Sequence, residues 1–394
     1  MGISDLRAAP GPLGFSRALK LTTSATATLV AIAIVATAAD WYLRRYAPPL
    51  REAPNIRFDP LLGWDSVPPI VPLTVSSAPH TVYFIGDSFT QDRRWPSVAQ
   101  QTAATDGLAV DGYVLGVSGF GTTQEWLKIE RDFAQHAPDL VVLQFFAWND
   151  LRDDWPYPAI AYSPTAFRRP YLVPAGSGYT LQPVAARTGL RDAIERTHLW
   201  RHIGFRALLR TDDLIARAAI NRMASWRLAL PVHYTERATW EPFYLSASAR
   251  DRYVHEAFGA TIEAFKRLAQ FLARNHARLL VVGLDNPFTV DDDVADAWVR
   301  SGIGFDVDLP LRRVGEMLRD AQIPFVDAAP ALRAAKQRHH RKIYNPPAGD
   351  LSGHLEPVGE DVFGAVAGRA MAELFKRAEA VRQRETATSI VSAR

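Results

Sequence analysis

The chain has 394 residues, with 45 lysines and arginines against 42 aspartates and glutamates and a net charge of +3. This length allows a sizeable buried core, either as one large domain with an insertion or as two modest domains. The near balance of charges argues against a nucleic-acid partner, which requires a basic surface. The absence of cysteine excludes disulfides, thiolate nucleophiles and cysteine-based zinc sites.

The N-terminal region contains an uncharged stretch at residues 21–39, which has about the length of a bilayer-spanning helix and is followed by Trp41 and Tyr42. We expect a short tail over residues 1–20, a transmembrane anchor over 21–39 and a linker over 40–79. This predicts an anchor in a bacterial-type inner membrane with the remaining chain exported. A cleaved signal peptide, giving a secreted form, is the alternative, because the Ala-Thr-Ala at 36–38 fits a cleavage site.

Beyond the linker, in which prolines recur, short apolar runs alternate with amphipathic stretches, and we place the folded domain at residues 80–390. Runs that are apolar throughout are typical of strands covered on both faces. The runs cover residues 81–86, 113–117, 140–146, 279–284 and 324–328. With helical patterns between them, they predict an α/β fold with a mostly parallel five-stranded sheet between two helical layers.

Residues 151–250 interrupt this alternation, since they are rich in Trp, Tyr, Pro and Arg and contain no convincing buried strand. We interpret them as a helical or irregular insertion between the third and fourth strands. Such an insertion emerges at the carboxyl edge of the sheet, where open α/β folds bind ligands. It therefore forms either a lid or wall of a substrate cleft, or a subdomain that only adds stability.

The first apolar run ends in "YFIGDSFT", which places Ser88 just after a strand and before a helical pattern. A hydroxyl there lies at the carboxyl edge of the sheet, beside the unpaired N–H groups and positive dipole end of the next helix. Gly86 allows a tight turn, and Asp87 can orient the loop. A simple N-cap serine is the alternative interpretation.

The second run leads into "LGVSGFGTTQ", where Gly116, Gly119 and Gly121 leave the backbone N–H groups accessible, as an oxyanion hole requires. The glycine order is not that of a dinucleotide-binding loop. A lipase nucleophile elbow around Ser118 is also excluded, because Phe120 stands where that motif requires glycine. An ordinary tight turn between strand and helix remains the alternative.

Two further residues, Asn149 and His354, complete the set of candidate site residues. Asn149 follows the third run in "FFAWND" and offers a side-chain amide at the same edge of the sheet. His354 lies directly before the last helical pattern, in "AGDLSGHLEPVG", where a neutral imidazole can accept the serine proton. Metal sites are not expected, because His198 and His202 have no third ligand and no HExxH motif is present.

Together these four motifs resemble those of the SGNH, or GDSL-type, hydrolase superfamily, over residues 59–375 without the insertion. The resemblance implies a three-layer, flavodoxin-like α/β/α fold and ester or acyl-transfer chemistry without metal or cofactor. It assigns the nucleophile to Ser88, the general base to His354, and the oxyanion hole to Gly119 and Asn149 together with the N–H of Ser88.

The sequence departs from the family pattern at three places. The asparagine often found in the second motif is not evident. Ala147 stands where the family usually has the glycine of its third motif. The acid that commonly lies two or three residues before the histidine is replaced by Leu351 and Ser352, so Asp350 is the nearest carboxylate on that side. Either Asp350 orients His354 or a backbone carbonyl does so.

The sequence therefore predicts a membrane-anchored serine esterase that cleaves an acyl ester of a small molecule or glycan. Two alternatives use the same fold. One is an O-acyltransferase acting on a cell-envelope polysaccharide, in which a sugar hydroxyl replaces water as acceptor. The other is a non-catalytic protein that binds carbohydrate or lipid.

Overall fold

The computed structural model describes residues 12–46, 56–74, 77–147, 149–154, 169–184, 252–285, 287–290, 306, 308–345 and 354–392. The chain divides into two compact units. Met1–Glu52 and Arg187–Leu208 form the first, which contains the helix α1 (Pro12–Tyr46). Ala53–Ala186 and Leu209–Arg394 form the second, which contains all other described elements.

The helix α1 includes residues 21–39, where the sequence predicted a membrane span, and several of its apolar side chains, such as Leu29 and Ile34, are exposed. Within the described residues, however, none of the helices combines the length and apolar character needed to cross a bilayer. The membrane-anchor prediction is therefore not supported.

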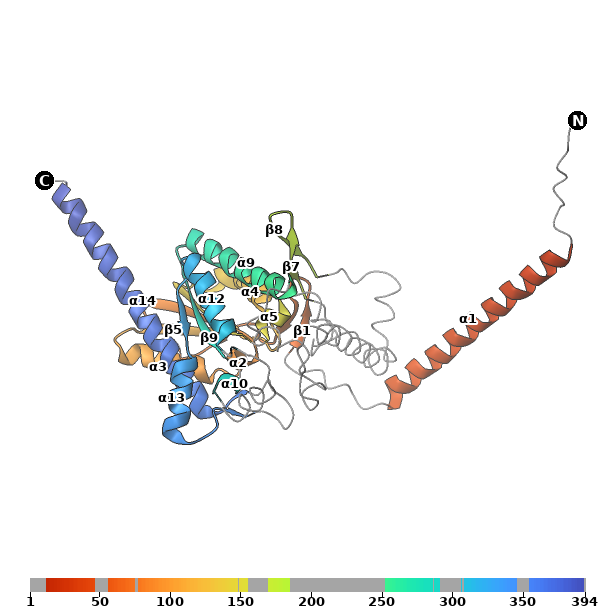
Figure 1. Ribbon diagram of the computed structural model, residues 1–394, viewed down its shortest axis with the longest axis horizontal. Coiled ribbons are helices and arrows are strands. Elements are labelled where there is room, and N and C mark those ends of the chain that lie inside the picture. Colours follow the sequence, from red (N-terminus) through yellow and green to blue (C-terminus); the bar gives the residue numbers. More distant parts are fainter. Residues whose placement is uncertain are drawn as a thin grey trace, which may run out of the picture. The chain divides into compact units, whose positions relative to one another are not determined.

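A six-stranded sheet in the order β10-β9-β6-β4-β5-β3 forms the centre of the second unit (Figure 1). Its strands are β3 (Val71–Pro72), β4 (His80–Ile85), β5 (Val110–Val114), β6 (Leu140–Phe146), β9 (Arg278–Leu284) and β10 (Phe325–Asp327). All neighbours pair in parallel except β3, which is antiparallel to β5. In chain order, the five parallel strands lie 2-1-3-4-5, which is the flavodoxin-like order. The predicted α/β fold with a mostly parallel sheet is confirmed.

Helices cover both faces of this sheet, because successive strand residues point to opposite sides. Tyr83 and Ile85 of β4 belong to one apolar cluster, and Val82 and Phe84 belong to another. The first cluster packs under α4 (Thr122–Asp132), α9 (Arg252–Arg274) and α12 (Leu309–Asp320). The second packs under α3 (Arg94–Thr105), α13 (Ala329–His339) and α14 (Pro357–Ser392). The layers are therefore α/β/α, as predicted.

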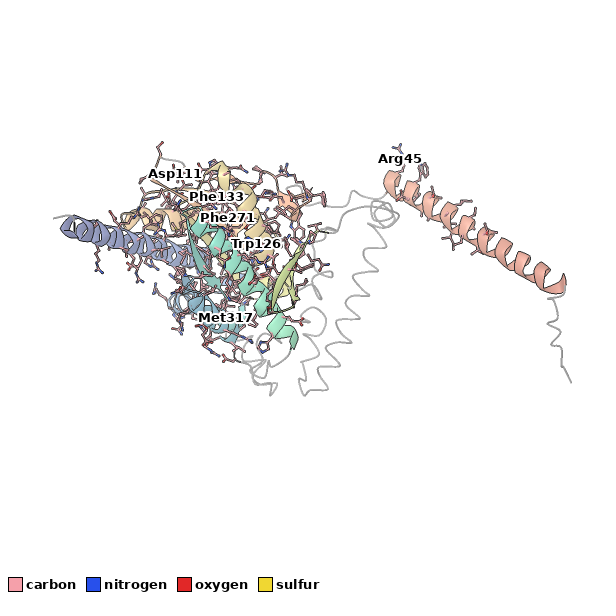
Figure 2. The ribbon with its side chains drawn as sticks, turned by 90° about the horizontal axis from the view of Figure 1, so that it is seen from above. Arg45, Asp111, Trp126, Phe133, Phe271 and Met317 are labelled. Carbon is pink, nitrogen blue, oxygen red and sulfur yellow. The ribbon has the colours of Figure 1, made fainter. Side chains whose placement is uncertain are left out.

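Aromatic contacts join neighbouring helices within the first layer. Phe133, in the short 3-10 helix η1 (Phe133–Gln135) that follows α4, meets Phe271 of α9 edge to face, with ring centroids 5.3 Å apart (Figure 2). Met317 of α12 packs against the same apolar cluster. The aromatic contact joins the end of α4 to α9, and α4 directly follows the loop that contains Gly116, Gly119 and Gly121.

Part of the predicted linker belongs to the folded domain. The strands β1 (Ile56–Asp59) and β2 (Gly63–Ser66) form an antiparallel hairpin, and β3 extends the central sheet. A buried ion pair at 2.7 Å joins Asp65 of β2 to Lys128 of α4. The linker assignment of residues 56–74 is therefore wrong, because strands this short leave no long apolar run in the sequence.

The described part of the insertion is also not helical throughout. It contains the end of α5 (Asp150–Asp153) and an antiparallel hairpin of β7 (Tyr171–Ala175) and β8 (Gly178–Gln182). This hairpin lies on α9, where the guanidinium of Arg267 donates to the carbonyl of Tyr179 at 2.7 Å. The segment lies between the third and fourth parallel strands, β6 and β9. The rest of it lies outside the described residues.

Candidate active site

Ser88 lies at the carboxyl end of β4, where the strand turns directly into the short helix α2 (Ser88–Gln91). Asp87 is the N-cap residue, and its side chain accepts the N–H of Phe89 at 3.0 Å. A Cβ atom at Gly86 would lie 2.3 Å from the hydroxyl of Thr90, so only glycine fits at this turn. The partly exposed hydroxyl of Ser88 is thus held at the rim of the sheet.

His354 meets Ser88 although the two residues are far apart in the chain. The imidazole Nε2 lies 2.9 Å from the Ser88 Oγ, which is hydrogen-bonding distance. His354 opens β12 (His354–Leu355), which pairs with β11 (Tyr344–Asn345) immediately before α14 begins. This contact is the geometry that a nucleophile and its general base require.

Two residues that follow Ser88 in the chain, Phe89 and Asp92, also contact the imidazole of His354. The Nδ1 of His354 lies 3.5 Å from the Oδ2 of Asp92, the residue that follows α2. The ring of Phe89 lies against the imidazole at a centroid distance of 4.7 Å. Hydrogen bonding to Asp92 is the main reason why the pKa of His354 is raised above its usual value. Three residues of one helical turn therefore contact a single histidine.

Two of the hydrogen bonds that hold the loop after β5 involve Ser118, the residue before Gly119. The N–H of Ser118 donates to the Oε1 of Gln91 at 3.0 Å, and its carbonyl accepts from the Nε1 of Trp64 at 3.0 Å. A trans peptide points its C=O and N–H in opposite directions, so the bond to Trp64 also fixes the direction of the Gly119 N–H. Among the described residues, that N–H has no protein acceptor. Gly119 has a φ of 75°, which favours glycine.

Asn149 follows β6, and its amide Nδ2 donates to the Oδ2 of Asp87 at 2.7 Å. An amide nitrogen carries two hydrogens, so one N–H is left for a ligand. Burial raises the pKa of Asp87 to about 6, although the hydrogen bonds from Asn149 and the Phe89 N–H oppose this shift. The carboxylate of Asp87 thus orients the amide of Asn149 next to Ser88.

Buried acids lie close to Asp87. Burial raises the pKa of Glu125 and Asp150 well above their usual values, and it also raises that of Asp154. Asp154 accepts hydrogen bonds from Thr123 and Thr261, whereas both carboxyl oxygens of Glu125 are buried without a partner among the described residues. Because burial favours the neutral form of a carboxyl group, these acids carry less negative charge than exposed acids do at the same pH.

The described residues contain no group of three or more His, Asp or Glu side chains that is arranged to hold a metal ion. What the rim of the sheet presents instead is a hydroxyl, an imidazole, a free backbone N–H and an amide. This set can transfer a proton and hold a developing negative charge.

The structure thus brings four of the predicted site residues to the carboxyl edge of the sheet: Ser88, Gly119, Asn149 and His354. The fifth, Asp350, lies outside the described residues. Sequence reasoning missed Asp92 and Gln91 as residues of the site. For Asp92 a signal was present, because it lies four residues after Ser88, and residues at this spacing share one side of a helix.

Comparisons with known proteins gave matches only among solved structures. No family model matches the chain, and no curated protein matches it. An acetylxylan esterase from Geobacillus stearothermophilus, solved as a catalytic mutant, aligns over 76% of this chain and 95% of its own, with 12% identity and a TM-score of 0.37. A GDSL-like lipase from Bacteroides thetaiotaomicron aligns over 75% and 89%, with 12% identity and a TM-score of 0.31. Because these scores are low, the strand order and site geometry carry the fold assignment.

Proposed function

We propose that this protein is a serine hydrolase of the SGNH/GDSL type that cleaves an acyl ester of a small molecule or glycan. The observation that carries the proposal is the 2.9 Å contact between the Ser88 Oγ and the His354 Nε2 at the carboxyl edge of the sheet. Ligands of open α/β folds bind at this edge. The free N–H of Gly119 and the amide of Asn149 provide donors for an oxyanion.

The reaction begins when the Ser88 Oγ attacks the ester carbonyl carbon and its proton passes to the His354 Nε2. The carbonyl oxygen becomes an oxyanion, which accepts hydrogen bonds from the N–H groups of Ser88 and Gly119 and from the Asn149 amide. The tetrahedral intermediate collapses, and the leaving alcohol takes the proton from His354. Water, deprotonated by His354, then attacks the acyl-enzyme. The bond to the Ser88 Oγ breaks, His354 returns the proton to this oxygen, and the acid is released.

Hydrolysis of p-nitrophenyl acetate by the full chain and two variants tests the proposal. Ser88→Ala removes the attacking oxygen and should abolish turnover. Ser118→Ala is the matched control, because the hydrogen bonds of Ser118 to Trp64 and Gln91 use its backbone carbonyl and N–H and not its hydroxyl. Equal hydrolysis by wild type and Ser88→Ala would refute the proposal.

The same residues serve acyl transfer if a sugar hydroxyl replaces water in the second half of the reaction. Product analysis with and without an added glycan acceptor separates the two reactions. Hydrolysis that is unaffected by acceptor supports the esterase, and acylated glycan in place of free acid indicates a transferase.

A further inference from the structure

Ser88 and Asp92 lie on the same side of one helical turn. Ser88 is the first residue of α2, and Asp92 is its C-cap residue, with φ −71° and ψ −11°. Residues four apart on a helix face the same way, about 5 to 6 Å apart at their Cβ atoms. The imidazole of His354 bridges this gap, with Nε2 at 2.9 Å from Ser88 and Nδ1 at 3.5 Å from Asp92.

We propose that Asp92 is the positioning residue that orients His354. For this role the sequence offered Asp350 or a backbone carbonyl. The inference rests on the proposed serine hydrolase function. When the Nδ1–H of His354 faces the Asp92 carboxylate, the Nε2 is unprotonated and its lone pair faces the Ser88 hydroxyl. Nucleophile and acid then come from one turn of helix, and only the base comes from elsewhere in the chain.

Among the described residues, the groups that interact with His354 are the Ser88 hydroxyl, the acids Asp92, Asp87 and Glu360, and the ring of Phe89. Each acid favours the imidazolium, and the hydrogen bond to Asp92 contributes most to the raised pKa of His354. Burial raises the pKa of Asp87 to about 6 and that of Glu360 to about 7, so both are partly neutralised at mildly acidic pH. Asp87 and Glu360 are present in both wild type and Asp92→Asn, so the difference between the two His354 titrations reports the contribution of Asp92.

Because His354 and Asp92 are both exposed, an effect of Asp92 on reactivity can be separated from an effect on folding. The side chains of His354 and Asp92 are 46% and 59% exposed. Exposed ion pairs contribute little to stability. Replacing Asp92 should therefore change the reactivity and the pKa of His354 without unfolding the domain.

The experiment compares Asp92→Asn, Asp350→Asn and Asp320→Asn in the full chain. Asp320 is an exposed residue at the end of α12 and serves as the control. For each protein, kcat/KM for p-nitrophenyl acetate is measured against pH. The pKa of His354 is measured independently by NMR titration, with His354→Gln used to assign its signal.

We expect Asp92→Asn to lower kcat/KM at least about tenfold, since a disordered base loses its tautomer and orientation. The acid limb of its pH profile and the NMR titration of His354 should both move to lower pH, while Asp350→Asn and Asp320→Asn match wild type. An unchanged rate and titration in Asp92→Asn would overturn the inference, whatever Asp350→Asn shows. Failure of the hydrolase proposal gives a different result: wild type itself has no turnover, while the titration still reports whether Asp92 acts on His354.

Discussion

The indole Nε1 of Trp64 donates a hydrogen bond to the carbonyl of Ser118 at 3.0 Å, across 54 positions of sequence. Trp64 is fully buried, and its ring meets Phe120 edge to face at 5.7 Å. The hairpin that carries Trp64 is joined to α4 by the ion pair between Asp65 and Lys128. The hairpin thus holds the peptide unit between Ser118 and Gly119 in place, and with it the Gly119 N–H.

Trp64→Phe keeps an aromatic ring at this position but removes the donor to the Ser118 carbonyl. The Gly119 N–H then loses its fixed direction, and we expect kcat to fall about tenfold while KM changes little, because an oxyanion donor acts mainly in the transition state. Steady-state kinetics of ester hydrolysis measure this. Trp95→Phe is the matched control, because Trp95 is equally buried but its Nε1 has no partner among the described residues. A similar loss of kcat in both variants would show that the hydrogen bond has no special role.

Gly86→Ala tests the turn that presents Ser88. Its Cβ would lie 2.3 Å from the Thr90 Oγ1 and 2.4 Å from the Gln144 Oε1, which also bond to each other at 2.9 Å. We expect lower stability by about 1 to 3 kcal/mol, from overpacking, together with lost activity. Urea unfolding and ester hydrolysis measure the two effects. Gly178→Ala, where nothing lies within 4 Å, should match wild type.

The central sheet was predictable because its strands are apolar throughout. A run such as residues 82–85 places alternate side chains in both apolar clusters, so the sequence shows that both faces of the strand are covered. The turns were predictable too, since Gly86 and Gly119 stand where side chains do not fit or where φ is positive. The catalytic roles of the site residues stay predictions.

Other features could not be predicted, because they depend on contacts between distant segments. The strands β1 and β2 have four residues each, too few for a clear alternation, and their position depends on the ion pair of Asp65 with Lys128. The contact of Asp92 with His354 arises only when β12 folds back onto α2. A search for an acid beside the histidine in sequence therefore pointed to Asp350.

Lys128→Met tests the ion pair that fastens the hairpin to α4. The ammonium and the Asp65 carboxylate are both 0% exposed, and Asp132 lies 3.3 Å away on the same helix. Arg131 still pairs with Asp65 and Asp132 at 2.6 Å in the variant, but one of the two cations of this buried cluster is lost. Breaking a buried pair costs up to about 3 to 5 kcal/mol of unfolding free energy. Urea denaturation measures this, and the exposed Lys266→Met serves as control. Equal stability of the two variants would contradict the importance of this pair.

The buried acids predict how stability depends on pH. Burial raises the pKa of Glu125 in the folded protein well above its usual value, so the folded state binds more protons than the unfolded state between these two pKa values. The contribution of Glu125 to stability is therefore highest below its unfolded pKa, near 4, and decreases as pH rises towards the folded pKa.

Glu125→Gln imitates the protonated acid and should remove this decrease. We expect the variant to gain stability over wild type as pH rises from about 5 to 8, measured by thermal unfolding at each pH. The partly exposed Glu130→Gln, on the same helix, should keep the wild-type dependence. If the stability of wild type and that of Glu125→Gln change in parallel with pH, Glu125 is not the source of the pH dependence.

Reaction with a fluorophosphonate, read by mass spectrometry of the peptide that contains Ser88, tests the central claim most directly. The account predicts one phosphonyl adduct on Ser88 in wild type and in Ser118→Ala, and strongly slowed labelling in His354→Gln, because the hydroxyl then lacks its proton acceptor. A correctly folded wild type that stays unlabelled at Ser88, or labelling of Ser88 at the wild-type rate in His354→Gln, would contradict it.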